Sequence, residues 1–259
     1  MFFEKSRKIF NFRLAEGQHL TFTFNNAINS MKILTTAVIA LSTLGVHAAS
    51  ISINDPSFES NSGGDMNPGG WNNGLDPDWT GKDGQNAGGA FEEYINGFVA
   101  VGTDHVGMGT GYYIWQDTGV AITPNTTYTL TVAAGNRNAS FSSPGNASTY
   151  GLLAGATTLG AQGYANTAEV LADTNLTLAS GSVDASTFNE SSFGDGAPLV
   201  FTTGANVPSE NLVVLLGDNS AGGRSHFDNI RLEAVAAVPE PSSLLLGALA
   251  GVFLLRRRR

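Results

Sequence analysis

The sequence predicts an all-β protein whose body is a jelly-roll β-sandwich, with an N-terminal signal helix before it and a single C-terminal membrane helix after it. Two observations predict the sandwich. Charged residues make up only 14% of the 259 residues, whereas an average soluble domain has roughly 25%. In residues 50–235, short runs rich in β-branched and aromatic residues alternate with clusters of Gly, Asn, Ser and Pro, and long helical periodicity is missing. That pattern is typical of short strands joined by turns.

The expected strands follow one another at short intervals through this region. Thr127–Ala134 alternates Thr with larger apolar residues, as a half-buried strand does. Leu212–Leu216 is continuously apolar, which is typical of a central strand, and His226–Val235 alternates less cleanly, which predicts a β-bulge near Asn229. Only Asn166–Ala172 predicts a short helix. The full set of expected strands is Ser50–Ile53, Phe98–Thr103, Tyr112–Asp117, Thr127–Ala134, Tyr150–Ala154, Leu176–Ser182, Leu199–Thr203, Leu212–Gly217 and His226–Val235.

Two long polar loops interrupt these strands, at Asn61–Ala90 and at Asn136–Thr149. Loops of this length inside a compact domain are usually functional or disordered, so both are candidates for the site.

The charge of the body excludes one class of partner. Between Ala49 and Val238 the chain has 4 Lys and Arg against 19 Asp and Glu, which leaves a formal charge of −15. A nucleic-acid-binding protein needs basic residues to displace counterions, so nucleic acid is not expected as a partner. The chain has 0 Cys, which excludes disulfides, thiolate zinc sites and cysteine nucleophiles.

Residues 31–48 have the features of a secretory signal peptide and form the expected signal helix. Lys32 supplies a positive charge, and Ile33–Val46 is apolar apart from small or hydroxyl residues. Small side chains at the −3 and −1 positions predict cleavage by signal peptidase after Ala48, with Ala49 as second choice. A buried helix of the fold is the alternative interpretation.

Because a signal normally begins near the initiator, we expect Met31 to be the true start and residues 1–30 to be a gene-model extension, with a long n-region as the alternative.

Residues 238–259 have three parts in a fixed order. Val238, Pro239, Glu240 and Pro241 come first, and the two prolines stiffen an extended segment that a processing enzyme could grip. An apolar run from Leu244 to Leu255 follows and is shorter than the about 20 residues of a full membrane span. The last four residues are basic and would hold that end in the cytoplasm, with the body outside; they are Arg256, Arg257, Arg258 and Arg259.

This tail closely resembles the PEP-CTERM sorting signal, in which a Pro-Glu-Pro motif precedes a membrane helix and a basic tail. The resemblance implies recognition by an exosortase, an integral-membrane enzyme of Gram-negative bacteria that make extracellular polysaccharide. It therefore implies secretion across the inner membrane, anchoring through the C-terminal helix before processing, and a final location at the cell envelope, cell surface or extracellular matrix. An ordinary tail anchor or a disordered end is the alternative.

The body carries a second resemblance in three short motifs. Asn54–Glu59, Ile122–Leu130 and Phe227–Leu232 are similar to the opening, the strand–turn–strand and the last strand of carbohydrate-binding-module-like jelly rolls with the galactose-binding-like fold. Asn125 replaces the usual Gly of the turn, and Asn also adopts the left-handed backbone conformation that such a turn needs.

The resemblance implies a structural Ca²⁺ held by Glu59 of the opening motif and Asp228 of the last strand, with backbone carbonyls and Asp55 as candidates to complete the oxygens. The alternative is that both carboxylates are solvated or paired with Arg231. A weaker calcium candidate is Asp76–Asp83, whose oxygens have the spacing of an EF-hand loop, although Ala87 stands at the position of the bidentate Glu and an ordinary polar turn is the alternative.

Aromatic residues suggest a sugar-binding surface, because aromatic rings stack on the apolar faces of sugars. Trp71, Trp79 and Trp115 are the candidate glycan contacts, and core packing is the alternative for each.

Sequence support for catalysis is small, and we expect the protein not to be an enzyme. The body has two histidines, His105 and His226, and we interpret His226 as a packed or hydrogen-bonded strand residue. Glu92 or Glu93 could form a glycosidase pair with another carboxylate, but the sequence does not report the separation that this chemistry needs.

The sequence thus predicts a secreted, exosortase-sorted protein with a structural or adhesive body associated with exopolysaccharide. The alternatives are a dedicated carbohydrate-binding module with a defined glycan ligand and, less favoured, a glycoside-active enzyme.

Overall fold

The computed structural model describes residues 8–13, 19–24, 48–60, 70–72, 75, 77–82, 89–138, 147–220 and 222–237. The chain divides into two compact units, of which His47–Ala237 is the body. The other unit contains an antiparallel hairpin of β1 (Lys8–Arg13) and β2 (His19–Phe24). The expected membrane helix in 238–259 lies outside the described residues, as does the signal helix up to residue 47. None of the helices in the described ranges is long and apolar enough to cross a membrane.

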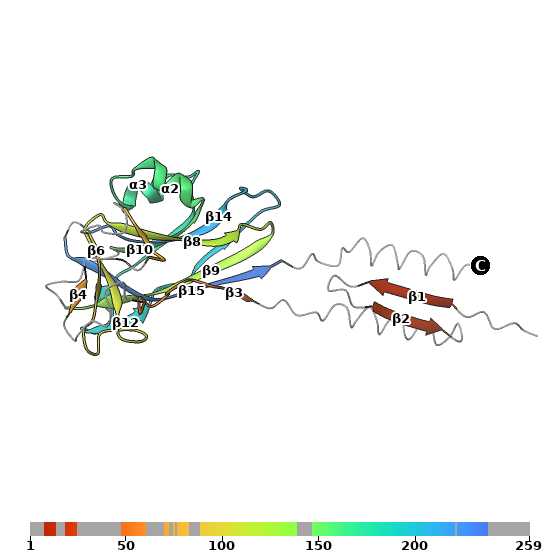
Figure 1. The fold of residues 1–259 in the computed structure, drawn as a ribbon, viewed down its shortest axis with the longest axis horizontal. Helices are drawn as coiled ribbons and strands as arrows, with labels where there is room; N and C mark the ends of the chain where they lie inside the picture. Colours follow the sequence, from red (N-terminus) through yellow and green to blue (C-terminus); the bar gives the residue numbers. More distant parts are fainter. Residues whose placement is uncertain are drawn as a thin grey trace, which may run out of the picture. The chain divides into compact units, whose positions relative to one another are not determined.

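The body is a sandwich of two sheets, and the predicted jelly-roll class is confirmed (Figure 1). One sheet has five strands in the order β11-β10-β14-β8-β5, and the other has eight, with β12-β9-β15-β7-β6-β4 as its path and β13 and β3 paired to β9 and β15. The strand bounds are β3 (Ala49–Ile51), β4 (Trp71–Asn72), β5 (Thr80–Gly81), β6 (Ala90–Glu93), β7 (His105–Gly109), β8 (Tyr113–Ala121), β9 (Thr126–Asn136), β10 (Ser148–Ala154), β11 (Thr177–Val183), β12 (Ser192–Asp195), β13 (Leu199–Thr202), β14 (Asn211–Asp218) and β15 (Arg224–Ala236). Two short helices, α2 (Ala156–Gln162) and α3 (Thr167–Ala172), and a 3-10 turn, η1 (Ala185–Thr187), complete the body.

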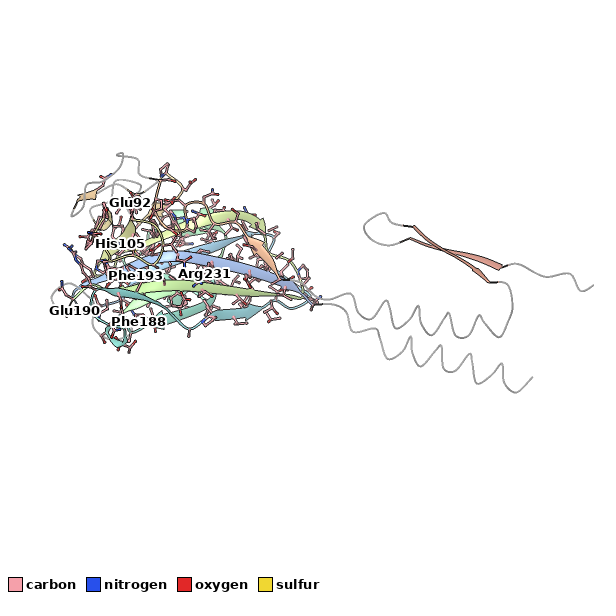
Figure 2. All side chains as sticks on the ribbon, turned by 90° about the horizontal axis from the view of Figure 1, so that it is seen from below. Glu92, His105, Phe188, Glu190, Phe193 and Arg231 are labelled. Carbon is pink, nitrogen blue, oxygen red and sulfur yellow. The ribbon has the colours of Figure 1, made fainter. Side chains whose placement is uncertain are left out.

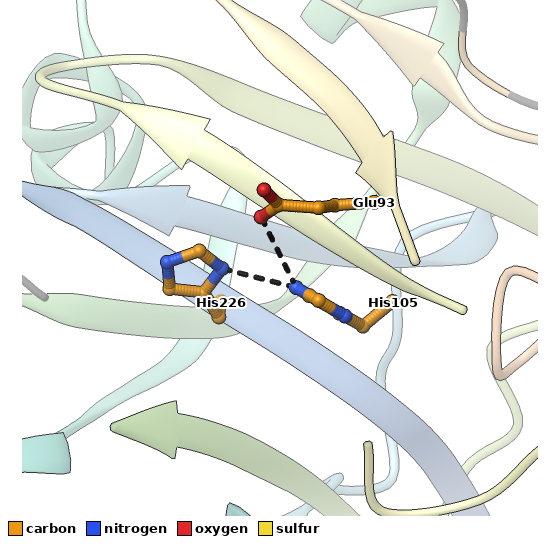
Figure 3. Close-up of side chains that lie close together, drawn as sticks. All are labelled: Glu93, His105 and His226. Atoms are coloured by element: carbon orange, nitrogen blue, oxygen red, sulfur yellow. Dashed lines mark hydrogen bonds and ion pairs between the residues drawn. The ribbon is translucent and has the colours of Figure 1, made fainter. Parts of the chain in front are cut away.

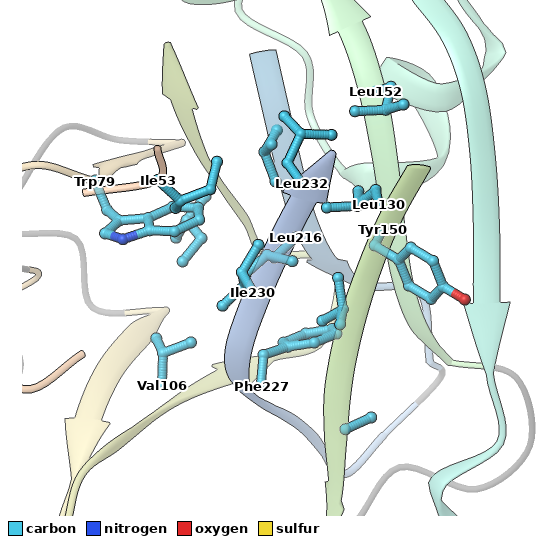
Figure 4. Close-up of a cluster of buried hydrophobic side chains, with 14 of the residues drawn as sticks. Ile53, Trp79, Val106, Leu130, Tyr150, Leu152, Leu216, Phe227, Ile230 and Leu232 are labelled. Atoms are coloured by element: carbon cyan, nitrogen blue, oxygen red, sulfur yellow. The ribbon is translucent and has the colours of Figure 1, made fainter. Parts of the chain in front are cut away.

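The core between the sheets follows the alternation of the sequence (Figure 4). In β9, the apolar residues that alternate with Thr along the strand are buried in the core. They are Tyr128, Leu130, Val132 and Ala134. This strand therefore has one face in the core, as predicted from its alternating pattern.

The continuously apolar strand β14 is buried on both faces. Leu212, Val214 and Leu216 enter the core between the sheets, whereas Val213 and Leu215 enter a second apolar cluster beneath α2 and α3. The helices thus cover the outer face of the five-stranded sheet (Figure 1). This explains why β14 lacks the polar positions of a half-exposed strand.

Local backbone predictions are also confirmed. Asn166 is the N-cap of α3, where its side-chain oxygen accepts a hydrogen bond from the N–H of Glu169. The β-bulge lies where β15 shifts register between Asp228 and Arg231, and Asn229 there has a positive φ of 48°. Asn125 has a φ of 50°, so it takes the left-handed conformation that the turn demands.

Other segments differ from expectation. Residues 98–103 form a loop rather than a strand, and β7 was not predicted because its sequence, His-Val-Gly-Met-Gly, reads as a glycine-rich turn. Gly107 is needed in this strand because a Cβ there would lie 2.4 Å from the ring of Phe91. α2 was missed because it buries a single large residue, Leu159, and therefore carries little helical periodicity.

Candidate functional site

Three chemistry-bearing side chains lie on the outer face of the eight-stranded sheet. Glu93 of β6 pairs with His105 of β7, and His226 of β15 lies opposite Gly107. The sequence neighbours Val106 and Phe227 belong to the core between the sheets. Since successive strand residues point to opposite faces, the Glu and the two His side chains point away from that core.

The three side chains converge (Figure 3). His226 Nδ1 lies 3.2 Å from His105 Nε2, and Glu93 Oε2 lies 3.6 Å from the same His105 nitrogen. Both histidines are 0% exposed and Glu93 is 5% exposed. In the described part of the chain this is the only group of three or more His, Asp or Glu whose ligand atoms all lie within 4.8 Å of one another.

Two phenylalanines cover this cluster. Phe98, from the loop before β7, meets His105 and His226 edge to face at 5.0 and 5.4 Å between ring centroids. Phe193 of β12 lies 4.7 Å from Phe98 and 5.5 Å from His105 (Figure 2). Gly135 makes room for both rings, because a Cβ there would lie 2.6 Å from Phe193 and 2.7 Å from Phe98. The cover thus combines residues of two strands, β9 and β12, with one loop residue.

The surroundings of His226 favour its neutral imidazole form. Burial lowers the pKa of His226 well below its usual 6.5, and the charges of His105, Arg137 and Arg224 lower it further. Arg137 donates to both oxygens of Glu93, with Nη1 at 2.8 and 3.0 Å. The far ring nitrogens, His105 Nδ1 and His226 Nε2, are buried without a hydrogen-bond partner among the described residues. Two imidazole nitrogens and one carboxylate oxygen therefore converge as a donor set for a cation or for proton transfer.

The predicted calcium ligands hold one loop. Glu59 accepts hydrogen bonds from the N–H of Thr103 at 2.8 Å, the hydroxyl of Thr103 at 2.9 Å and the N–H of Asp104 at 2.9 Å. Asp228 accepts from the N–H of Ala100 at 2.6 Å and of Val101 at 3.0 Å. Burial raises the pKa of Asp228, and these two hydrogen bonds partly offset that effect. The opening motif and the last strand thus act on the same segment, residues 100–104, and the Ca²⁺ itself stays a prediction.

The other calcium expectations have mixed outcomes. Arg231 forms an ion pair with Asp195 rather than with either predicted calcium ligand. In the EF-hand-like segment, Asp76 and Asp83 lie outside the described residues, and Asp78 accepts a hydrogen bond from Asn54.

For two of the three predicted glycan contacts the structure favours the core-packing alternative, because both side chains are buried in apolar clusters. Trp79 is 0% exposed, packs 5.2 Å from Phe58 and donates its indole N–H to the carbonyl of Asp55. Trp115 is 7% exposed and belongs to the apolar cluster beneath the helices. Trp71 begins β4, and its side chain lies outside the described residues.

Glu92 and Glu93, the two glutamates considered for a glycosidase pair, point to opposite faces of the sheet. Glu92 pairs with Val106 and Glu93 with His105, so the two carboxylates lie on opposite faces of β6. Glu93 is instead brought together with His105 and His226, a group that the sequence did not predict because the two histidines are 121 residues apart.

The processing residues mark the limits of the body. Ala48 is exposed, and Ala49 begins β3 and pairs with Ala234 at the far end of β15. Val238–Pro241 and Arg256–Arg259 lie outside the described residues.

Comparison with known proteins places the chain in a family. Residues 49–233 match the HpiC1-like family profile, described as HpiC1 cyclase, and the chain belongs to that family. Residues 237–259 match the PEP-CTERM protein-sorting motif, so the predicted sorting signal is confirmed and the chain is exported and sorted to the cell surface or beyond by an exosortase. The resemblance drawn from the body motifs named carbohydrate-binding modules and did not include the cyclase family. No curated protein matches the chain.

Solved structures agree with this fold. The Stig cyclase Fisc from Fischerella sp. TAU, in complex with (3Z)-3-(1-methyl-2-pyrrolidinylidene)-3H-indole, is 21% identical with a TM-score of 0.54, over 74% of this chain and 100% of that one. A cyclase from the same organism with 4-(1H-indol-3-yl)butan-2-one is 21% identical with a TM-score of 0.53, over 73% and 100%. A family 16 carbohydrate-binding module is 23% identical over 59% and 92%, with a TM-score of 0.36. At these identities the cyclase structures show the fold alone.

Proposed function

We propose that this protein is a secreted envelope protein whose β-sandwich body is a structural or adhesive, non-enzymatic component of an exopolysaccharide matrix. One observation carries the proposal: the sorting motif begins at residue 237, directly after β15 ends at Ala236. Because β15 completes its pairing with β3 and β9 before that point, removal of the tail leaves the body with all its strands. A complete domain that survives processing is suited to display or release.

The charge of the body sets a condition on adhesion. A formal charge of −15 between residues 49 and 238 repels an acidic polysaccharide, and divalent cations can bridge the two. We therefore expect binding to acidic exopolysaccharide to need Ca²⁺ or Mg²⁺ and to be lost in a chelator.

Intact-mass analysis tests the sorting half of the proposal. The native protein is purified from the envelope and from the medium of an exosortase-containing host, as wild type and as Glu240→Ala. The exposed Glu233→Ala in β15 is the matched control, because it removes a carboxylate just before the motif. We expect wild type and control to start at Ala49 or Ser50 and to lack Leu244–Arg259, and Glu240→Ala to keep the tail. A wild-type species that retains Leu244–Arg259 contradicts the proposal.

Cosedimentation tests the adhesive half. The processed protein is mixed with exopolysaccharide extracted from the same host, with divalent cations or with a chelator. Retention only with cations supports an adhesive body, whereas no retention together with an unchanged matrix in a deletion strain contradicts it. If a neutral glycan is bound in chelator, a dedicated carbohydrate-binding module replaces the adhesive role, and Trp71→Ala then tests the remaining tryptophan candidate.

A cyclase-type enzyme is the second candidate function. The family match over residues 49–233 favours it, as does a buried carboxylate beside two imidazoles that can donate or accept protons. The related structures hold indole ligands, so 4-(1H-indol-3-yl)butan-2-one is a suitable probe. Saturation-transfer NMR measures its binding to the processed protein, and mass spectrometry of indole-containing precursors measures turnover. Binding or turnover that is lost in Glu93→Gln would replace the non-enzymatic proposal.

A further inference from the structure

Two separations within the cluster of Glu93, His105 and His226 are close to those of ligands around a small divalent ion. Zinc binds imidazole nitrogen at about 2.0–2.1 Å and carboxylate oxygen at about 2.0–2.2 Å in tetrahedral geometry, which places two ligand atoms about 3.3 Å apart. The observed separations are 3.2 Å between the two histidine nitrogens and 3.6 Å between Glu93 Oε2 and His105 Nε2. No ligand atom of the three is more than 4.8 Å from another.

From this geometry we propose that Glu93, His105 and His226 form a binding site for a transition-metal ion of the zinc class. The donor set is two imidazole nitrogens and one carboxylate oxygen. Such a set suits Zn²⁺, Co²⁺ or Ni²⁺ and does not suit Ca²⁺, which takes six to eight oxygen ligands. The site is therefore distinct from the calcium expectation at Glu59 and Asp228.

The elements around the site hold the ligands in place. β6, β7 and β15 are neighbours in one sheet, so the three ligands stand on paired backbone rather than on loops. Arg137 orients Glu93 through its hydrogen bonds to both carboxylate oxygens, as outer partners of metal-binding carboxylates do. Gly107 leaves the space for His226, since a Cβ there would lie 3.3 Å from its Nδ1.

The cover of the site shields the two imidazoles from solvent. Phe98 and Phe193 exclude water from the two imidazoles, and water exclusion strengthens electrostatic attraction between an ion and its ligands. Three protein ligands leave the fourth tetrahedral position to a water or a small anion. The loop that carries Phe98 is joined to β7 through residues 100–104, which Glu59 and Asp228 hold by hydrogen bonds.

Metal titration of the processed, tag-free protein tests the proposal, because a polyhistidine tag binds the same ions. The protein is stripped with a chelator, dialysed and titrated with Co²⁺ and Zn²⁺, while the visible Co²⁺ spectrum, the metal content and the melting temperature are measured. We expect one ion per chain, a tetrahedral Co²⁺ spectrum that Zn²⁺ abolishes and Ca²⁺ does not, and a higher melting temperature.

Variants separate this site from adventitious binding. Glu93→Gln and His105→Gln keep side-chain size, and each is expected to weaken Zn²⁺ binding by more than about 100-fold, whereas Arg137→Met is expected to weaken it about 10-fold. Glu233→Gln, at an exposed position of β15, is the control and is expected to bind as wild type does. Far-UV circular dichroism shows that each variant is folded.

Equal Zn²⁺ affinity in folded Glu93→Gln and wild type overturns the proposal, as does a wild-type protein without a stoichiometric ion. These measurements use purified protein, so their outcome is independent of whether the polysaccharide proposal fails.

Discussion

The outer faces of the two sheets are covered by different kinds of side chains. The five-stranded sheet packs an apolar set, including Leu153, Val213 and Leu215, under α2 and α3. The eight-stranded sheet instead buries Glu93, His105 and His226 under two phenylalanine rings. Apolar burial stabilises the first face by itself, whereas the second buries a carboxylate and two imidazoles, which lowers stability unless they are paired or bind a ligand. Arg137 pairs with the carboxylate, so the remaining cost lies at the far nitrogens of the two imidazoles, which have no hydrogen-bond partner among the described residues.

The largest expected effect lies on the helix-covered face. Leu215→Ala removes a side chain that is 0% exposed beneath the helices, and we expect it to lower the free energy of unfolding by about 2–5 kcal/mol. Urea denaturation measures this change, and metal binding is expected to be unaffected. Val200→Ala, at a position 59% exposed, is the control with an expected change within about 0.5 kcal/mol. Equal effects at both positions would contradict the assignment of Leu215 to a packed cluster.

A smaller loss of stability is expected when a methyl group is added on the outer face of the eight-stranded sheet. Gly107→Ala places a methyl group 2.4 Å from Phe91 and 3.3 Å from His226, and we expect a loss of about 1–3 kcal/mol together with weaker Zn²⁺ binding. Gly204→Ala is the control, because a Cβ there meets no atom within 4 Å. Thermal unfolding compares the two variants. If Gly107→Ala melts like Gly204→Ala, the close packing of β7 against Phe91 is refuted.

The polar face should also make stability depend on pH. Because burial lowers the pKa of His226 in the folded state, the unfolded chain binds a proton below pH 6.5 that the folded protein does not, and stability falls as the pH decreases through that value. The expected slope from this residue is at most about 1.4 kcal/mol per pH unit. Urea unfolding in a chelator, between about pH 5 and 8, compares wild type with His226→Gln, in which the slope is expected to be flatter. The raised pKa of Asp228 acts in the opposite direction in both proteins, and equal slopes would contradict the assignment to His226.

The smallest expected effect is a change in the pKa of Tyr164, which packs against the helix-covered cluster. Tyr164 donates a hydrogen bond of 2.5 Å to Asp173, and desolvation followed by this bond raises its pKa to about 12. In Asp173→Asn we expect the pKa of Tyr164 to fall toward 10, because ionisation no longer breaks a bond to a carboxylate. Ultraviolet titration measures the tyrosinate, and Tyr150, whose pKa is raised by burial alone, serves as the internal reference. An unchanged titration curve would show that Asp173 has no part in the shift.

Much of the fold was predictable because it rests on local pattern. The alternation in Thr127–Ala134, the apolar run in β14 and the Asn residues at 125 and 229 each express a requirement of a single strand or turn. Residues 98–103 were wrongly expected to form a strand because their β-branched residues resemble one, whereas carboxylates far away in sequence, Glu59 and Asp228, hold them as a loop.

The candidate site was only partly predictable. Each of its three polar residues stands out in the sequence, but their convergence depends on the pairing of β6, β7 and β15, which local pattern does not specify. β7 was not recognised as a strand because it contains two glycines. Gly107 stands there because the ring of Phe91 occupies the space that a Cβ would need. A His at the first residue of one strand and another near the start of its partner strand was the available signal. The sorting motif, by contrast, is a linear pattern and could be predicted from the sequence alone.

The most direct test of the difference between the two faces is a zinc-edge anomalous difference map of crystals of the processed protein grown with Zn²⁺. We predict a peak within coordination distance of Glu93 Oε2, His105 Nε2 and His226 Nδ1. A map in which these three atoms surround no peak, while zinc lies at surface carboxylates, would contradict the claim that the eight-stranded sheet carries a built site.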